Sequence, residues 1–312
     1  MTRTFTSEMM PTSATTTERP AFLYLLGVDG GGTGTRVILA DALGQELARA
    51  SAGPSGLMHG IPAAWQAILT AVDAAFAEAF LMRPNLDQIA IACGLAGVHN
   101  RAWAEEFSLA NPGFGGLVLE TDARTTLLGA HQGRAGAIIA LGTGSIAEAL
   151  LPDGSCREAG GWGFPSSDEA SGAWMGLRAM NHTQQAVDGR VPDDALARDV
   201  VAFCGGSRDA MFVWLAGANQ TRFAQLAPFV IAHAQTNSVA RGIMLSAGVE
   251  VQKMVNALDS VGTMPIALCG GLADAVLPFL PEEVQQRVSK PIGDSVAGAL
   301  YLVKKNFMKT VA

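Results

Sequence analysis

The sequence predicts an α/β protein in which one architecture occurs twice. Three observations predict it: a run of short apolar strands opens each half of the chain, a glycine-rich turn interrupts each run, and segments with helical spacing follow. With 312 residues, the chain is long enough for two domains of ordinary size, each with its own core.

The first half begins with three predicted strands joined by tight turns, which indicates an antiparallel start to a sheet. These strands are expected over residues 22–30, 35–41 and 46–53. A helix is expected over 62–82, because apolar residues recur at helical spacing from Trp65 to Phe80 and Pro84 closes the segment. A strand over 87–97, a helix over 100–110 and a strand over 117–123 complete a β-β-β-α-β-α-β order.

The second half repeats the opening. Strands are expected over 136–144, 145–154 and 156–161, followed by long helical stretches, a late strand over 265–271 and an amphipathic helix over 295–307. We therefore expect an N-terminal domain over residues 21–122 and a C-terminal domain over 123–293, with the last helix, about 294–312, packing onto the first domain. Residues 1–20 are rich in Ser and Thr and are expected to form a disordered tail.

Composition excludes several classes of function. A net charge of −7 and a pI near 5.2, without a cluster of Lys and Arg, argue against a nucleic-acid partner. The four cysteines are widely spaced, which excludes the usual local ligand patterns of zinc and iron-sulfur sites. The sequence has neither the long apolar segment of a membrane span nor a signal peptide, so we expect a cytoplasmic protein without a membrane partner.

Two glycine-rich turns carry the first functional signal. Asp29 ends the first apolar strand, and Gly30, Gly31, Gly32 and Thr33 follow it. Glycines supply backbone N–H groups without a Cβ atom in the way, so a tight hairpin of this kind can hold phosphate oxygens. A similar turn, GTGS over 142–145, opens the second half. Two such turns in two similar domains could hold one triphosphate from both sides.

Seven motifs then point to a family. They are VDGGGTGTR (28–36), ACGLAG (92–97), ETDA (120–123), ALGTGS (140–145), GGWGFPSSDEASG (160–172), LCGGLAD (268–274) and GDSVAGAL (293–300). In this order they resemble the N-acetylglucosamine kinase and BadF/BcrA-type ATPase branch of the actin, sugar-kinase and Hsp70 superfamily, and within it the bacterial glucosamine kinases. The resemblance implies two ribonuclease H-like (actin-like ATPase) domains with the active site in the cleft between them. It also implies ATP-dependent phosphorylation of an amino sugar at O6 with Mg²⁺.

The resemblance also implies roles for the nucleotide side of the site. Asp29 would hold Mg²⁺ through water, and Asp122 would be the catalytic base. The residues expected to bind ATP are Gly30, Gly31, Gly32, Thr33, Gly142, Thr143, Gly144, Ser145, Gly270 and Gly271. Structural alternatives exist for some of them, because Asp122 precedes a helical segment and suits an N-cap, and Gly270-Gly271 suits a plain strand-to-helix turn.

The stretch 160–172 is expected to line the sugar. By resemblance Gly161, Trp162 and Asp168 contact it, with Glu169 beside them, whereas the alternatives are that the two acids cap the following helix and that Trp162 belongs to the core. Related kinases commonly carry an Asn after the third strand, where this chain has Gly56 or Leu57. Two residues of this loop could replace that contact, Ser55 or, with less support, His59.

The choice of sugar rests on charge. Carboxylates near the sugar favour the ammonium group of D-glucosamine over the neutral amide of N-acetylglucosamine, which remains the alternative substrate. Two other classes are related by fold. An ATPase activator of a radical dehydratase would need cysteines for a shared cluster, and a sugar-responsive repressor would need a helix-turn-helix domain longer than the N-terminal segment. The apolar composition also permits a homodimer.

Overall fold

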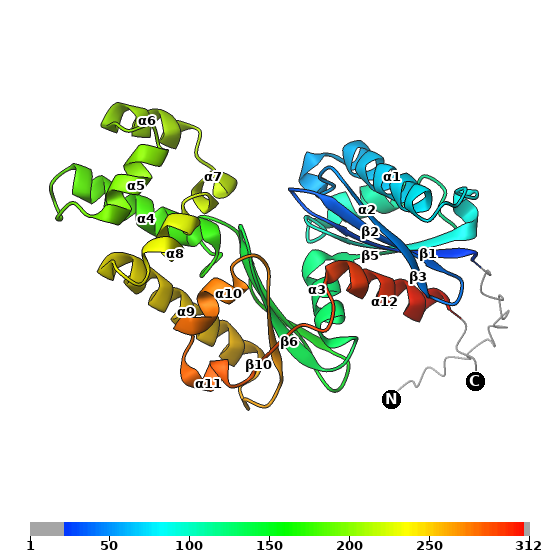
Figure 1. The fold of residues 1–312 in the computed structure, drawn as a ribbon. Coiled ribbons are helices and arrows are strands. Elements are labelled where there is room, and N and C mark those ends of the chain that lie inside the picture. Colours follow the sequence, from blue (N-terminus) through cyan, green and yellow to red (C-terminus); the bar gives the residue numbers. More distant parts are fainter. Residues whose placement is uncertain (1–21, 309–312) are drawn as a thin grey trace, which may run out of the picture.

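The computed structural model describes residues 22–308 and consists of two lobes, each built on one five-stranded sheet (Figure 1). The tail expected over residues 1–20 lies outside the described residues. Both lobes contain mixed sheets covered by helices, as the duplicated sequence pattern predicts.

The N-terminal lobe contains the sheet β3-β2-β1-β4-β5. Its strands are β1 (Tyr24–Gly30), β2 (Thr35–Asp41), β3 (Glu46–Ala52), β4 (Ile89–Leu95) and β5 (Gly116–Thr121). The first three pair antiparallel, and β4 and β5 continue the sheet parallel to β1. Side chains alternate along β1, so that Leu26 and Val28 join the core beneath α1 while Leu25 joins the core beneath α12.

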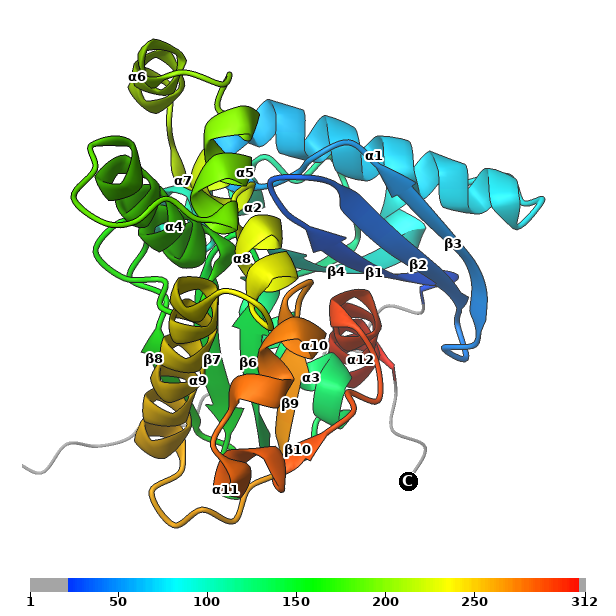
Figure 2. The ribbon, with the colours of Figure 1, turned by 60° about the vertical axis from the view of Figure 1, so that its left-hand side comes forward.

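The C-terminal lobe repeats this topology in the sheet β10-β9-β6-β7-β8 (Figure 2). Its strands are β6 (Gly136–Leu141), β7 (Ser145–Leu150), β8 (Cys156–Gly160), β9 (Ile266–Cys269) and β10 (Val288–Ser289). An antiparallel meander again comes first, and two parallel strands again extend it on the side of its first strand. The prediction of two ribonuclease H-like domains is therefore confirmed.

Four α-helices belong to the N-terminal lobe or its border. They are α1 (Ile61–Glu78), α2 (Arg101–Leu109), α3 (Asp122–His131) and α12 (Ser295–Phe307), with short 3-10 turns η1 (Leu57–His59) and η2 (Leu86–Gln88). The final helix α12 crosses back from the other lobe and packs on β1, β4 and α3. Gly27 and Gly298 permit this close approach, because a Cβ on either would lie within 3 Å of backbone atoms of its neighbour.

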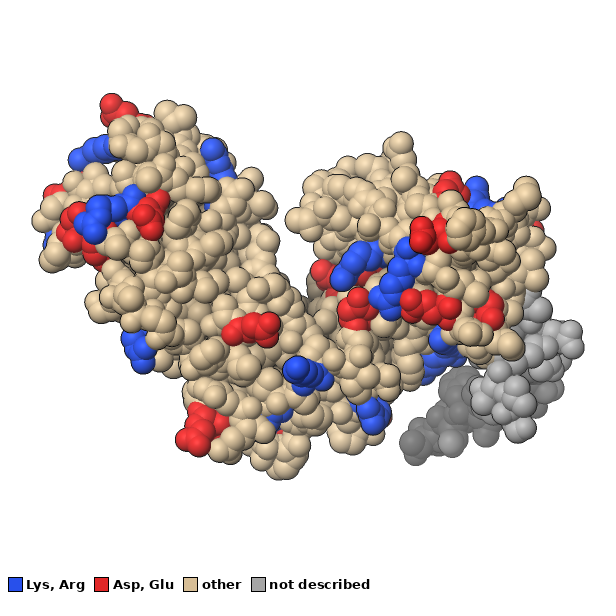
Figure 3. Space-filling view, in the orientation of Figure 1, with Lys and Arg blue, Asp and Glu red and all other residues tan. Residues whose placement is uncertain are grey.

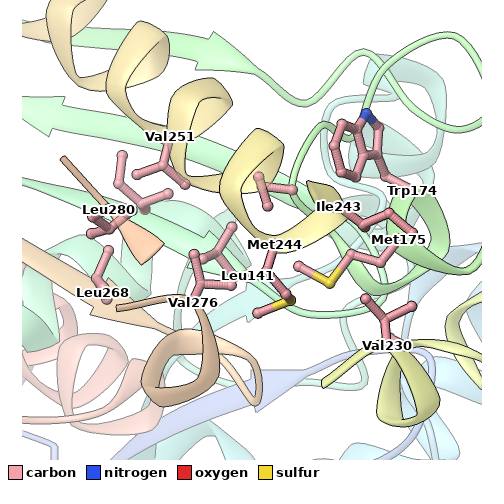
Figure 4. Packing of buried hydrophobic residues seen from close by; sticks show 14 of the residues in the cluster. Leu141, Trp174, Met175, Val230, Ile243, Met244, Val251, Leu268, Val276 and Leu280 are labelled. Carbon is pink, nitrogen blue, oxygen red and sulfur yellow. The ribbon is translucent and has the colours of Figure 1, made fainter. Parts of the chain in front are cut away.

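The C-terminal lobe has a larger helical layer. It contains α4 (Gly172–Val187), α5 (Ala195–Phe203), α6 (Arg208–Ala216), α7 (Gln220–Ala224), α8 (Ala227–His233), α9 (Ser238–Leu258), α10 (Ala273–Val276), η3 (Leu277–Phe279) and α11 (Glu282–Gln285). Its largest core lies between one face of the sheet and these helices. Figure 4 shows part of that core, including Met244 and Val251 of α9 and Leu268 of β9.

The first helix is shorter than its sequence pattern predicts. It ends at Glu78, and Phe80, expected on its apolar face, adopts φ +56° and is 96% exposed. The left-handed conformation turns the chain away from the helix axis, so the helical spacing no longer applies to Phe80. Within residues 22–308, no helix combines the length and the hydrophobicity that a membrane crossing requires.

Candidate active site

The carboxyl ends of β1, β4 and β5 meet at one edge of the first sheet. Gly30 is in register with Leu95, and Leu95 with Thr121. Asp29, the penultimate residue of β1, and Asp122, which follows the last residue of β5, therefore lie at the ends of two strands that are separated only by β4. The hairpin after β1 and the end of β6 face each other across the gap between the lobes (Figure 1), and the space-filling view shows that the molecular surface is deeply hollowed there (Figure 3).

Asp122 is the first residue of α3, but it is not the N-cap. Thr121 holds that position, and its hydroxyl accepts a hydrogen bond from the Arg124 backbone N–H (3.0 Å). One oxygen of the Asp122 carboxylate accepts from the N–H of Ala123 (3.0 Å). Burial raises the pKa of the Asp122 carboxyl above its ordinary value, and the negative charge of Asp29 adds to this effect. The N-cap alternative for Asp122 is therefore wrong.

Asp29 is held by an arginine from the neighbouring strand. Its Oδ2 accepts hydrogen bonds from Nη2 (2.6 Å) and Nε (2.9 Å) of Arg36, its partner in the β1–β2 register. The side chain of Asp29 is 18% exposed, and its Oδ1 has no hydrogen-bond partner among residues 22–308. One carboxylate oxygen is thus engaged and the other is available.

Backbone hydrogen bonds fix the first glycine turn against the loop after β3. The N–H of Gly31 donates to the carbonyl of Gly34, and the carbonyl of Gly31 accepts from the N–H groups of Ser55 and Gly56. A Cβ on Gly30 would lie 2.0 Å from Ser55 Oγ, whereas one on Gly31 would meet no atom within 4 Å. Gly30 is therefore required by packing inside the lobe, and Gly31 borders open space.

The remaining residues around this turn differ in accessibility. Gly32 and Thr33 are exposed, and the Nε2 of His59 lies 3.9 Å from the position of a Cβ on Gly32. Ser55 is fully buried, and its Oγ accepts a hydrogen bond from Thr35 (2.7 Å). The hydroxyl of Ser55 thus lies beneath the surface of the turn and supports it.

The second glycine turn is joined to the start of α4. The carbonyls of Gly142 and Thr143 accept hydrogen bonds from the N–H groups of Gly172 (2.8 Å) and Ala173 (3.2 Å). Ser145 is buried and donates its hydroxyl to the carbonyl of Glu169 (2.6 Å). These bonds fix the position of the turn relative to the loop that carries Asp168 and Glu169.

Asp168 lies under the second turn. It is 4% exposed, has φ +63°, and its Oδ2 accepts a hydrogen bond from Nε2 of Gln220. Burial raises the pKa of the Asp168 carboxyl, and a hydrogen bond from the backbone N–H of Ser145 opposes this rise. A Cβ on Gly144 would lie 2.8 Å from Asp168 Oδ2. The residues expected for phosphate and for sugar are therefore in direct contact here.

The alternatives for the sugar loop are not supported. The N-cap of α4 is Ser171, whose hydroxyl accepts from the N–H of Trp174 (3.1 Å), so neither Asp168 nor Glu169 caps the helix. Trp162 is 87% exposed and is not a core residue. Its neighbour Gly161 is exposed with φ +72°, a backbone conformation that favours glycine. An exposed indole is available to a ligand.

The late glycine pair lies beside the second turn. Gly270 has φ +89°, and a Cβ there would lie 2.3 Å from the carbonyl oxygen of Leu141, which accepts a hydrogen bond from the N–H of Leu272. Gly271 is exposed, and a Cβ there would meet no atom within 4 Å. The conformation thus requires Gly270 for the strand-to-helix turn, while Gly271 borders open space.

Two contact residues are not among the sequence-predicted site residues. Arg36 could have been found from the hairpin, because a turn that pairs Gly30 with Thr35 places Arg36 opposite Asp29. Gln220 could not, because it contacts Asp168 from a short helix 52 positions away in the sequence.

The donor set suits a metal that arrives with a nucleotide. Within residues 22–308 no group of three or more His, Cys, Asp or Glu side chains is placed to hold a metal ion. Mg²⁺ is usually bound by one or two carboxylates together with water and substrate phosphates. The free Oδ1 of Asp29 fits that pattern, and a site built only from protein ligands does not.

Comparison with known proteins identifies the family of this chain. The model of the BadF/BadG/BcrA/BcrD ATPase family matches residues 26–300. The chain belongs to this family. Glucosamine kinase GspK of Vibrio cholerae serotype O1 is 31% identical over 284 residues, covering 90% of this chain and 96% of that protein. N-acetyl-D-glucosamine kinase of Dictyostelium discoideum is 25% identical over 272 residues, covering 79% of this chain and 84% of that protein.

Solved structures place this family member among sugar kinases by fold. A candidate N-acetylglucosamine kinase from Chromobacterium violaceum is 51% identical with a TM-score of 0.89, and the match covers 91% of this chain and 100% of that one. A ROK family glucokinase from Streptomyces griseus, solved with glucose and AMPPNP, has a TM-score of 0.52 at 17% identity, which shows similarity of fold alone.

Proposed function

We propose that this chain is an ATP- and Mg²⁺-dependent amino-sugar kinase that phosphorylates D-glucosamine at O6. The observation that carries the proposal is the pairing of Asp29 and Asp122 at one sheet edge facing the cleft, in a chain whose relatives are named as glucosamine and N-acetylglucosamine kinases. A kinase needs a base for the attacking hydroxyl and an anionic group near the metal.

The proposed roles follow from the surroundings of each residue. Asp122 accepts the proton of the sugar 6-hydroxyl as that oxygen attacks the γ-phosphorus of ATP and the bond from this phosphorus to the bridging oxygen of ADP breaks. Its raised pKa makes Asp122 a stronger base than an exposed aspartate. The open faces of Gly31 and Gly271 let a nucleotide approach the backbone. Bound Mg²⁺ would neutralise charge on the phosphates, and Asp29 Oδ1 would reach it through water.

The sugar is proposed to lie between Asp122 and the loop 161–169. Trp162 offers an exposed aromatic face for the C–H surface of a hexose, and Glu169 keeps one carboxylate oxygen, Oε1, without a partner among the described residues. The ammonium group of D-glucosamine would gain a charge-assisted hydrogen bond there, which is worth about 1.5–3 kcal/mol net and corresponds to roughly a ten- to hundredfold preference.

N-acetylglucosamine is the second candidate substrate. The 51% identity to the candidate N-acetylglucosamine kinase from Chromobacterium violaceum favours it. The two proposals differ in whether the sugar nitrogen carries a charge, so a carboxylate beside it separates them. ATP as a substrate supports the expected cytoplasmic location, while a homodimer and the lack of a nucleic-acid partner stay predictions.

A three-sugar comparison tests the proposal. ADP release is measured at equal ATP with D-glucosamine, glucose or N-acetylglucosamine, and the product is analysed for phosphate at O6. We expect kcat/KM to be highest for D-glucosamine and lowest for N-acetylglucosamine. An equal or higher value for N-acetylglucosamine would select the second candidate, and ADP release that no sugar increases would contradict kinase activity altogether.

A further inference from the structure

The guanidinium of Arg36 lies between two carboxylates that come from distant parts of the chain. Its Nε and Nη2 donate to Asp29 at 2.9 and 2.6 Å, and its Nη1 lies 3.6 Å from Oδ2 of Asp294. Asp294 is the N-cap of α12, in the segment that returns from the C-terminal lobe. Figure 3 shows acidic and basic side chains gathered on this side of the N-terminal lobe, next to the hollow between the lobes.

Stability does not explain this arrangement well. Arg36 is 54% exposed and Asp294 is 40% exposed, and ion pairs between exposed groups contribute little to the free energy of folding. Asp29 differs because its side chain is mostly buried and lies at the sheet edge that faces the cleft. The ion pair between Arg36 and Asp29 therefore affects the charge of this edge more than the stability of the fold.

The charge at the edge depends on Arg36. Asp29 acts on Asp122 through its negative charge, and the groups placed to oppose these two carboxylates are Arg36 and the ring of His99. Arg36 forms the direct contact and carries a permanent positive charge. Without it, two carboxylates would border the empty cleft, and a bare divalent cation would be attracted there.

We propose that Arg36 takes the place of a cation beside Asp29, so that Asp29 accepts a divalent metal ion only together with the phosphates of a nucleotide. The proposal rests on the proposed role of Asp29 toward Mg²⁺. A metal ion without a nucleotide meets the neutral ion pair of Asp29 and Arg36, which attracts it weakly. A metal–nucleotide complex also gains contacts between its phosphates and the glycine turns.

The test measures the binding of Mn²⁺ to the full chain without a nucleotide. Binding is monitored by electron paramagnetic resonance as the loss of the free Mn²⁺ signal. Arg36→Met should bind Mn²⁺ at least about tenfold more tightly than the wild type, because one nearby positive charge is removed. Arg36→Lys should resemble the wild type, since it keeps the charge. Unchanged Mn²⁺ affinity in Arg36→Met would overturn the proposal.

Arg49 supplies a matched control. It is 50% exposed and its Nη1 also lies 3.6 Å from Asp294 Oδ2, but its other partner is Glu46 instead of Asp29. Arg49→Met removes the same charge and the same contact to Asp294, so it should leave Mn²⁺ affinity within about twofold of the wild type. An equal gain in both variants would indicate a general effect of net charge and would also overturn the proposal.

A second measurement separates this inference from the proposed function. Asp29→Asn should weaken the effect of Mg²⁺ on ADP binding, measured by calorimetry, and should abolish the Mn²⁺ affinity gained by Arg36→Met in the double variant. If Asp29→Asn leaves Mg²⁺-dependent ADP binding unchanged, the proposed metal role of Asp29 fails. If it weakens that binding while Arg36→Met gains no Mn²⁺ affinity, only the inference about Arg36 fails.

Discussion

Asp29 and Asp122 lie at the carboxyl ends of two parallel strands of one sheet, where burial raises the pKa of the Asp122 carboxyl and the negative charge of Asp29 adds to this rise. One carboxylate is compensated by Arg36, while the other is buried and accepts one hydrogen bond from a backbone N–H. The two aspartates at this edge thus have different environments. Asp29 is suited to bind a cation, and Asp122 is suited to accept a proton.

Replacing Asp122 by Asn tests its role as the base. The variant should lower kcat by about 10²–10⁴-fold, the usual contribution of a general base, with little change in ADP binding. Because the substitution removes a buried charge, its free energy of unfolding at pH 8 should equal or exceed that of the wild type. Near-normal turnover in a folded variant would remove Asp122 from this role.

The pH dependence of activity follows from the same residue. A base must be ionised to accept a proton, and the pKa of Asp122 is raised by burial, so kcat should fall with decreasing pH while the ordinary aspartates, with a pKa of about 3.9, are still ionised. Initial rates at saturating ATP between about pH 4 and 9 would check this. An acidic limb that matches an ordinary aspartate would be inconsistent with the assignment.

The two glycine turns should respond differently to a side chain. Gly31→Val should raise the KM for ATP with little loss of melting temperature, because its Cβ faces open space. Gly144→Val should affect both ATP and sugar kinetics and lower the melting temperature, because its Cβ would meet the Asp168–Gln220 pair. Unchanged ATP kinetics in Gly31→Val would argue against a phosphate site at the first turn.

Glu148 should make stability depend on pH. It is buried on β7, its Oε2 has no partner among the described residues, and burial raises its pKa to about 7 despite the Arg124 guanidinium at 3.3 Å. The native state therefore binds the proton more tightly than the unfolded chain, and stability falls as pH rises from about 4.5 to about 7. Relative to Glu148→Gln, the wild type should lose roughly 1–3 kcal/mol over this window in urea unfolding. Parallel pH profiles would contradict the shift.

Close packing of α12 gives a stability prediction. A Cβ on Gly298 would lie 1.8 Å from the carbonyl oxygen of Thr125 in α3, so Gly298→Ala should cost about 1–3 kcal/mol of unfolding free energy. The control is Gly242→Ala on α9, where a Cβ would meet nothing within 4 Å and helix propensity favours alanine. Equal stability of the two variants would show that α12 is not tightly packed at Gly298.

Much of the fold could be predicted because its signals are local. The strand runs, the two glycine turns and the helix over 295–307 depend on patterns within a few residues, and the repeated topology followed from their order. The end of α1 was predicted too late, because a single left-handed residue stops a helix whatever its apolar spacing. The helices between α4 and α9 are shorter than the long helical stretches that the sequence predicts there.

The site was predictable where residues follow strands and obscure where contacts join distant segments. Asp29 and Asp122 stand at strand ends, and parallel pairing brings strand ends together. The burial of Ser55 and the contact of Gln220 with Asp168 depend on how loops pack, which one sequence does not encode locally. The alternatives for Asp122, Asp168 and Trp162 could be decided only when Thr121 and Ser171 were seen to cap their helices and the indole was seen at the surface.

The return of α12 to the first sheet has a consequence for biosynthesis. Leu25, Ile38 and Ala92 belong to a core that also contains Val296 and Leu300, so one face of the N-terminal sheet lacks the cover of α12 until the ribosome has made the entire C-terminal lobe. The C-terminal lobe has its strands and core helices within one continuous stretch, so it can fold before the last helix, α12, has been synthesised. The half of the chain that is translated first is therefore the half that completes its folding last, and in the interval its exposed apolar face is a natural target for a chaperone.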